Sequence, residues 1–432
     1  MVGSLECIEG LKVTFQTFHT LHTFKTFKNQ HTFSYLEMKL TKEIILQTQD
    51  YETPCLVVDL NIIKQNYLQM KECFSDVDIF YAIKANSDTN IIKTLMSLGS
   101  KFETSSINEV KLLLTLGVKP ENIVNSAPYR KEEYLKRMYK MGIRMFVYDT
   151  EIELEKFKRS GPEAELFLRV DVDNTGSDWP LSKKFGVEPE DAVELIKKAD
   201  EMGIKVLGTT FHVGSQCLNL ENWNKALTQM KNIHDECKQN GINLEMINLG
   251  GGIPIKHLKE IPNVKETAEK IKSFVNEKFS PIPKTIIEPG RGLVGNAGIM
   301  IAEVISKRDY KGQTWIYLDI GVFHGMMETI EGFDYEILTE NDITDPSNSN
   351  IEKETYVIAG PSCDGVDVMF KDGKKMSKVE VGDRVFIRNA AAYTICYASL
   401  FNGYKIPKTY YVKNGNNFLF SPNCLVETIY RL

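Results

Sequence analysis

The sequence predicts an α/β protein built from an eight-stranded α/β (TIM-like) barrel and a C-terminal all-β domain. The barrel is predicted because short apolar runs alternate with helical patterns from Ile79 to Gly290. Strands that alternate with helices form parallel sheets, and eight such units in about 210 residues fit a closed barrel. The β domain is predicted because helical patterns become scarce after about residue 298, where apolar runs follow one another with turns between them.

The eight predicted barrel strands are five to eight residues long, and each has an apolar centre. They are 79–83, 101–105, 122–126, 144–149, 165–171, 206–213, 244–250 and 285–290. Several intervening helices should end at a glycine in the left-handed conformation, namely Gly99, Gly117, Gly142, Gly203 and Gly241. An open doubly wound sheet is the alternative, but its glycine-rich loop belongs in the first unit. Here a GGG run follows the seventh strand.

The chain divides into three predicted regions. Residues 55–297 should form the barrel, and residues 38–54 and 298–432 the β domain, which a strand from before Cys55 joins. Among its other strands, the sequence predicts ones within 314–323, 354–362, 383–389 and 409–414.

Residues 1–37 are a low-complexity N-terminal extension in which Thr-Phe occurs five times. We expect the working protein to begin at Met38. A basic targeting peptide is the alternative, which the absence of Arg from this segment disfavours.

The composition excludes several classes of protein. With 42% hydrophobic and 25% charged residues, the chain is neither disordered nor fibrous. No apolar run approaches the roughly 18 residues of a membrane span, and a net charge of −6 disfavours nucleic acid as a partner. The eight cysteines include no C-x-x-C pair, so we expect no disulfide scaffold, no metal site and a reducing, cytoplasmic compartment.

Reactive residues stand at four predicted strand ends, where the active sites of α/β barrels lie. Lys84 follows the first strand, and His212 ends the sixth. Gly250–Gly252 follow the seventh strand, and Glu288 ends the eighth. Each has an ordinary structural explanation when taken alone: an ion pair for the lysine, a packed histidine, a tight turn, and a Glu288–Arg291 pair.

One ligand accounts for all four positions. A partly desolvated Lys84 could form a Schiff base with an aldehyde, and His212 could cover an aromatic ring. The three glycines leave backbone N–H groups open to a phosphate, which Arg291 could also bind. Glu288 could keep a pyridinium nitrogen protonated. Pyridoxal 5'-phosphate carries all four groups, so we predict it as the cofactor.

Three residues of the predicted β domain could add to this site. Cys363 and Asp364 lie in the turn GPSCDG, where a buried structural cysteine is not expected. Cys363 could act as a general acid, and Asp364 could bind a cationic substrate. Tyr393 could offer its hydroxyl to the phosphate, although packing within a strand would also explain it.

Six motifs, taken in order, resemble the fold-type III pyridoxal-phosphate decarboxylases, and most of all the ornithine/lysine decarboxylases. They are YAIKAN, FHVGSQ, GGGIP, EPGRGLVGNAG, GPSCDG and AAYT…FNGY. DWPLSKKFG and YLDIGVFHGMMET resemble the bacterial-type ornithine decarboxylase branch. The resemblance runs from about Thr53 to the C-terminus. It implies that L-ornithine is converted to putrescine for polyamine biosynthesis, and that the enzyme is an obligate homodimer with active sites at its interface.

The resemblance also implies roles for the cofactor residues. Lys84 would be the Schiff-base lysine, His212 would stack on the cofactor ring, and Glu288 would bind the ring nitrogen. The phosphate would be held by Ser215, Gly251, Gly252, Arg291 and Tyr393.

For the substrate, the resemblance implies that the partner subunit donates Cys363 to reprotonate the α-carbon and Asp364 to bind the distal ammonium. Glu109 matches a family carboxylate near the site. Two positions depart from the family, because Glu103 and Glu331 stand where Asp is usual. Glu331 would help to bind the distal amine, and one more methylene moves a carboxylate by about 1.3–1.5 Å in a packed pocket. The choice between ornithine and lysine therefore stays open.

Three rival functions would carry other residues. An amino-acid racemase would have a tyrosine base where GPSCDG stands. A diaminopimelate decarboxylase would have a Glu–Ser stretch after the cysteine, whereas Asp364 suits a cationic substrate end. A non-catalytic regulatory homologue would have lost cofactor residues, and all of them are present here.

Overall fold

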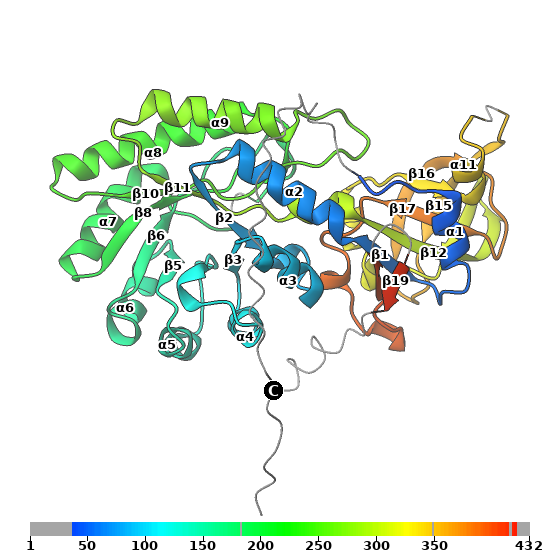
Figure 1. Ribbon diagram of the computed structural model, residues 1–432, viewed down its shortest axis with the longest axis horizontal. Coiled ribbons are helices and arrows are strands. Elements are labelled where there is room, and N and C mark those ends of the chain that lie inside the picture. Colours follow the sequence, from blue (N-terminus) through cyan, green and yellow to red (C-terminus); the bar gives the residue numbers. More distant parts are fainter. Residues whose placement is uncertain (1–36, 182–183, 348–349, 414–416, 421–432) are drawn as a thin grey trace, which may run out of the picture. The chain divides into compact units, whose positions relative to one another are not determined.

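Eight parallel strands form a closed barrel in the computed structural model, which describes residues 37–181, 184–347, 350–413 and 417–420. Their order around the barrel is β10-β11-β2-β3-β4-β5-β6-β8 (Figure 1). The last strand in sequence, β11, pairs with the first, β2, with Ile287 beside Ile79. The predicted barrel is therefore confirmed. The predicted N-terminal extension covers residues 1–37, and its first 36 residues lie outside the described part of the chain.

Each barrel strand lies within or overlaps one of the eight predicted apolar runs. The strands are β2 (Val77–Ala82), β3 (Lys101–Thr104), β4 (Ile123–Asn125), β5 (Met145–Tyr148), β6 (Glu165–Arg169), β8 (Lys205–Thr210), β10 (Met246–Asn248) and β11 (Lys284–Ile287). The helices that alternate with them cover the outside of the barrel (Figure 1). They are α2 (Leu60–Cys73), α3 (Thr89–Ser97), α4 (Ile107–Thr115), α5 (Glu132–Lys140), α6 (Glu151–Ser160), α7 (Ala192–Glu201), α8 (Glu221–Gln239) and α9 (Val264–Lys278).

The predicted helix-ending glycines all adopt the left-handed conformation. Each follows the last residues of α3, α4, α5, α7 or α8, and their φ angles lie between 74° and 92°. At Gly99, Gly117, Gly203 and Gly241 a Cβ atom would meet nothing within 4 Å, so the backbone conformation alone explains the glycine there.

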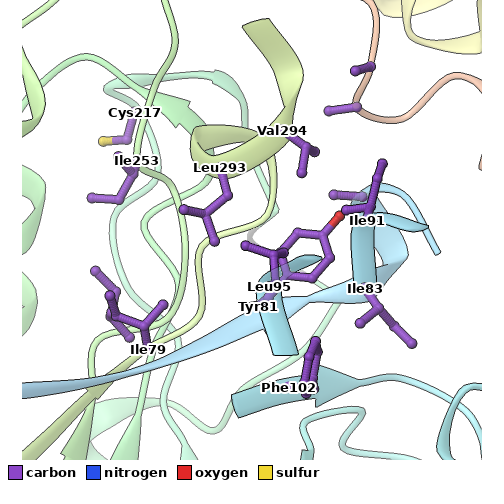
Figure 2. Close-up of a cluster of buried hydrophobic side chains, with 14 of the residues drawn as sticks. Ile79, Tyr81, Ile83, Ile91, Leu95, Phe102, Cys217, Ile253, Leu293 and Val294 are labelled. Atoms are coloured by element: carbon purple, nitrogen blue, oxygen red, sulfur yellow. The ribbon is translucent and has the colours of Figure 1, made fainter. Parts of the chain in front are cut away.

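Alternation along the strands separates two parts of the core. Phe80, Val124, Val147, Phe167, Leu207, Met246 and Ile286 are buried and form one cluster, with each side chain coming from a different barrel strand. The neighbours of Phe80 in β2, Ile79 and Tyr81, belong to the other cluster. Figure 2 shows these two side chains with Phe102 of β3 and with Leu293 of α10 (Arg291–Val294). The barrel is thus packed inside and outside, as period-two strands require.

β1 and the strands that follow the barrel form a nine-stranded mixed sheet. Its strands are β1 (Cys55–Asp59), β12 (Gly298–Tyr310), β13 (Gln313–Leu318), β14 (Ile337–Thr339), β15 (Lys353–Ala359), β16 (Val368–Ser377), β17 (Arg384–Arg388), β18 (Lys408–Lys413) and β19 (Asn417–Phe420). Two short helices, α1 (Lys42–Thr48) and α11 (Glu340–Thr344), precede β1 and follow β14. β7 (Ser177–Trp179) and β9 (Ser215–Cys217) form a separate pair.

The sequence analysis predicts that the strand joining the β domain lies before Cys55, which is too early in the chain. It is β1, which begins at Cys55 and pairs with β12 and β18. The apolar run CLVVD leads directly into α2, so the sequence pattern alone assigned it to the barrel. The domain boundaries otherwise stay a prediction.

A turn that follows β17 reaches the mouth of the barrel. The backbone N–H of Tyr393 donates to the carbonyl of Ala85 over 2.8 Å, and Asn86 donates from its side chain to the carbonyl of Ala391 over 2.9 Å. This turn therefore lies against the residues that follow β2.

None of the helices in the described part of the chain has the length and apolar composition needed to span a bilayer.

Candidate active site

The barrel residues predicted to bind the cofactor gather beyond the carboxyl ends of the barrel strands. Lys84 lies in a 3-10 turn (Ile83–Ala85) directly after β2, and Glu288 follows β11. His212 lies two residues past the end of β8. This is the end of the barrel at which α/β-barrel enzymes carry out their chemistry.

Lys84 is paired with a carboxylate. Its Nζ lies 2.9 Å from Oε2 of Glu103, which is fully buried, while the Lys84 side chain is 41% exposed. Desolvation lowers the pKa of Lys84, but Glu103, Tyr393 and Glu288 together raise it more, so the net pKa lies above its ordinary value. Without cofactor the lysine is a cation, which differs from the neutral amine expected from burial alone.

Glu109 has a structural task in α4. Its Oε2 accepts from the backbone N–H groups of Ser105 and Ser106 over 2.6 and 3.1 Å, which forms a capping box. Ser105 also donates from its hydroxyl to Glu103 over 3.3 Å. Burial and the charge of Glu103 raise the pKa of Glu109 to about 7. Ser105 therefore bridges Glu109 and Glu103 by hydrogen bonds, and in this way links Glu109 to the Lys84–Glu103 pair.

Glu288 is buried and accepts two hydrogen bonds at a single oxygen. Its Oε1 accepts from the hydroxyl of Ser126 over 2.6 Å and from Nδ2 of Asn248 over 2.7 Å. Burial and the charge of Glu103 raise its pKa, and Lys84 together with these hydrogen bonds acts in the opposite direction.

His212 is held as a neutral ring. Its Nδ1 lies 3.0 Å from the backbone N–H of Gly214 and accepts from it, which assigns the ring proton to Nε2. Burial and the nearby cations Arg169 and Lys84 lower the pKa of His212 well below its usual range. A Cβ at Gly251 would lie 3.0 Å from Nε2, so the glycine run and the imidazole are in direct contact.

The glycine run needs glycine for two reasons. Gly250 and Gly252 have φ angles of 64° and 96°, which other residues rarely adopt. A Cβ at Gly250 would lie 2.1 Å from the carbonyl oxygen of Phe211, and one at Gly252 would lie 2.7 Å from that of Gly214. No side chain fits here, so the backbone itself lines this part of the site.

Arg291 is buried in an ion pair that the sequence did not reveal. Its Nη2 lies 2.5 Å from Oε1 of Glu328, and the two side chains are 2% and 4% exposed. Oε2 of Glu328 accepts from the hydroxyl of Tyr335 over 3.1 Å, and Nε of Arg291 donates to Ser215 over 3.4 Å. Nη1 of Arg291 is buried without a hydrogen-bond partner among the described residues. One arm of the guanidinium is therefore left for a ligand.

Tyr393 lies beside this guanidinium. The two centres are 4.9 Å apart, and a Cβ at Gly290 would lie 3.0 Å from the tyrosine hydroxyl. Tyr393 lies outside any strand and has a φ of 55°, a strained conformation for a non-glycine residue. The simple explanation of a packed strand tyrosine is therefore wrong. Burial raises its pKa to about 12.

Three predicted substrate residues lie at the surface. Cys363 and Asp364 are exposed in a turn, where the backbone N–H of Cys363 donates to the side chain of Asn402 over 2.9 Å. Glu331 is exposed at the end of a 3-10 turn (Met327–Glu331). Within the described chain, none of their hydrogen bonds or ion pairs reaches Lys84.

Four site residues escaped the sequence analysis: Ser126, Arg169, Asn248 and Glu328. Arg169, Asn248 and Ser126 end or follow apolar runs, as Lys84 and Glu288 do, so the same positional argument could have found them. Glu328 has no such signal, because it comes from a polar turn outside the barrel.

Comparison with known proteins agrees with this site. The family model described as "Pyridoxal-dependent decarboxylase, pyridoxal binding domain" matches residues 60–295. The chain is 30% identical to the lysine/ornithine decarboxylase of Selenomonas ruminantium over 375 residues, which cover 85% of this chain and 92% of that protein. It is also 30% identical to the ornithine decarboxylase of Rattus norvegicus over 388 residues, or 85% of this chain and 82% of that one.

A solved structure has the same architecture. The crystal structure of lysine/ornithine decarboxylase from Vibrio vulnificus, complexed with putrescine, superposes with a TM-score of 0.76 at 27% identity and covers 86% of this chain and 97% of its own. The barrel and the residues at its mouth define a pyridoxal-dependent amino-acid decarboxylase. The chain belongs to the ornithine/lysine decarboxylase family of fold-type III enzymes.

Proposed function

We propose that this protein uses pyridoxal 5'-phosphate to decarboxylate L-ornithine, giving putrescine and carbon dioxide. The observation that carries the proposal is the Lys84–Glu103 pair at the barrel mouth, whose lysine also interacts electrostatically with the buried carboxylate of Glu288. The names of the two curated relatives support a basic amino acid as the substrate. Decarboxylation of L-lysine, or of both amino acids, is the alternative.

The residues present fit this cofactor. The unpartnered Nη1 of Arg291 supplies a buried donor for a phosphate, and the side-chain-free turn at Gly251 and Gly252 leaves room for it. Ser215 and Tyr393 offer hydroxyl groups beside the same guanidinium.

The other end of the site suits the pyridine ring and the aldehyde. Neutral His212 offers a flat face, Glu288 a carboxylate for the ring nitrogen, and Lys84 an amine for the aldehyde. When bound, the cofactor supplies an electron sink for the bond to the leaving carboxylate. Glu103 is placed to take up or return the proton of Lys84 at Nζ, because Nζ already donates a hydrogen bond to it over 2.9 Å.

The substrate side of the site requires a second subunit in this proposal. Cys363 of one chain would protonate the α-carbon of the product in the other, and Asp364 would bind the distal ammonium. Glu331 would assist it, and Glu109 would act through Glu103 and Ser105.

The surface around Cys363 supports a homodimer. Exposed apolar side chains gather in the neighbouring segment, where Leu400 is 67% exposed and where Tyr397, Phe401 and Tyr404 also reach the surface. The hydroxyl of Tyr404 donates to the carbonyl of Pro361, which ties this segment to the turn of Cys363. Such a patch favours burial against a partner.

All six described cysteines are free thiols, which supports the expected cytoplasmic location.

The test is amine formation, followed by mass spectrometry. Purified protein with pyridoxal phosphate would receive L-ornithine, L-lysine, L-arginine and meso-diaminopimelate in parallel. We expect putrescine as the main product, and no product from the Lys84→Ala variant, because no other described amine pairs with Glu103. Cadaverine as the main product would move the assignment to lysine. No amine from any substrate, with cofactor bound, would contradict the proposal.

A further inference from the structure

We propose that Ser126 and Asn248 are positioning residues that hold Glu288 as an ion, with its second oxygen directed at the ring nitrogen of the cofactor. The inference rests on the proposed function and adds two residues that the resemblance to known decarboxylases did not supply. Three features of the barrel mouth support it: the strands that carry the donors, the single oxygen that they share, and the fixed orientation of the amide.

The two donors approach Glu288 from different parts of the barrel. Asn248 is the last residue of β10, the strand next to β11, while Ser126 follows β4, which lies three places away on the other side of β11. Ser126 therefore reaches across the mouth of the barrel to make its 2.6 Å hydrogen bond. A contact across the mouth fixes the carboxylate more firmly than a neighbouring strand alone could.

Both hydrogen bonds end on Oε1 of Glu288. Within the described part of the chain no hydrogen bond to Oε2 is found, although the residue as a whole is only 7% exposed. Oε2 is not among the fully buried side-chain atoms that lack a partner, so the remaining exposure of Glu288 leaves this oxygen open at the barrel mouth. A protonated ring nitrogen would satisfy Oε2, and the two bonds at Oε1 leave it free for that purpose.

The side-chain amide of Asn248 can act only as a donor toward Glu288. Its Oδ1 accepts from the backbone N–H of Gly250 over 2.9 Å, which fixes the orientation of the amide and turns Nδ2 toward Oε1. An amide nitrogen donates and does not accept, so this bond stabilises the ionised carboxylate and not the protonated one. Asn248 thus joins the phosphate-side glycine turn to the nitrogen-side carboxylate.

The surrounding charges explain why such donors are needed. Burial and the carboxylate of Glu103 favour protonation of Glu288, whereas Lys84 and the guanidinium of Arg169 favour its ionised form. His212 is neutral and adds no charge to help. The hydrogen bonds from Ser126 and Asn248 therefore act together with Lys84 and Arg169 to keep Glu288 ionised against its burial and the charge of Glu103.

The test compares three variants in the cofactor-loaded protein. Asn248→Asp keeps the acceptor for Gly250 but replaces the donor to Glu288 by a second carboxylate, and Ser126→Ala removes the other donor, which Ser126→Thr restores. We expect cofactor affinity to fall about tenfold in the first two. The acid limb of the visible absorbance of the bound cofactor should move to higher pH by about one unit, since Glu288 would be protonated sooner.

Asn125→Asp is the matched control. Asn125 is also buried at the end of a barrel strand and donates from its amide to a carbonyl, that of Thr104, over 3.1 Å, without touching Glu288. It should lower stability and leave the acid limb in place. If Asn248→Asp and Ser126→Ala behave like this control, the two residues only fill the barrel mouth and the inference is wrong. If the wild-type protein binds no pyridoxal phosphate, the proposed function fails instead.

Discussion

Arg291 and Glu328 form the most thoroughly buried ion pair around the candidate site. Both side chains have lost nearly all contact with water, and Arg291 also packs on the ring of Phe333, whose centre is 4.6 Å from the guanidinium. Desolvation lowers the pKa of Arg291, but the charge of Glu328, Tyr335 and the hydrogen bond to Glu328 together outweigh it and raise the pKa above its ordinary value. Each charge therefore depends on the other, because neither has water to replace its partner.

Removal of Glu328 should destabilise the protein strongly. In Glu328→Ala the guanidinium would stay buried without a counter-charge, and we expect a loss of about 3–5 kcal/mol of unfolding free energy. Denaturant unfolding of the protein without cofactor measures this. Glu336→Ala is the control, because Glu336 pairs with Arg388 over 2.7 Å in a more exposed setting, where a pair contributes about 1 kcal/mol or less. Equal losses in both variants would contradict the argument.

These residues also show what the sequence could and could not reveal about the site. Lys84 and Glu288 were found because a charge that directly follows an apolar strand is unusual. Glu328 was missed because its partner is 37 positions away in sequence and no pattern joins them. The pairing of Lys84 with Glu103 was missed for the same reason, although both residues were identified separately.

At the scale of secondary-structure elements, the turn Gly250–Gly252 after β10 requires glycine both for its backbone conformation and because a side chain has no room there. Gly250→Ala would need both a positive φ and a Cβ 2.1 Å from the carbonyl of Phe211. We expect the turn to rearrange and cofactor binding to be lost, as followed by the visible absorbance of the loaded protein. Gly241→Ala, with a φ of 81° but nothing within 4 Å, should cost only about 1 kcal/mol and leave binding intact. Normal binding in Gly250→Ala would refute this account of the turn.

Elements with a strong period were predicted well, and those without one were not. All eight barrel strands have apolar runs of the right length, which explains their agreement with the structure. The pair β7–β9 was not predicted, because its three-residue strands SDW and SQC have no apolar pattern. β1 was assigned to the wrong sheet, since its pairing with β12 and β18 depends on residues more than 200 positions away.

At the scale of the whole molecule, Lys84 and Cys363 lie in different parts of one chain, although both are proposed to act in the same reaction. In one chain, Lys84 lies at the barrel mouth, whereas Cys363 is exposed in a turn bonded to Asn402. If each site takes Lys84 from one subunit and Cys363 from the other, two differently inactivated chains can complement each other. In a mixed dimer of Lys84→Ala and Cys363→Ala, one of the two sites would have both wild-type residues.

Mixing the two variants in equal amounts, after subunit exchange, should therefore restore about one quarter of the wild-type rate of amine formation, because half of the dimers are mixed and half of their sites are intact. Each variant alone gives the baseline. Substitution of exposed Leu400 by Lys in both chains should abolish the recovery, since a charge in the apolar patch opposes burial of the interface. A mixture no more active than the average of its two components would mean that Cys363 acts within its own chain or not at all.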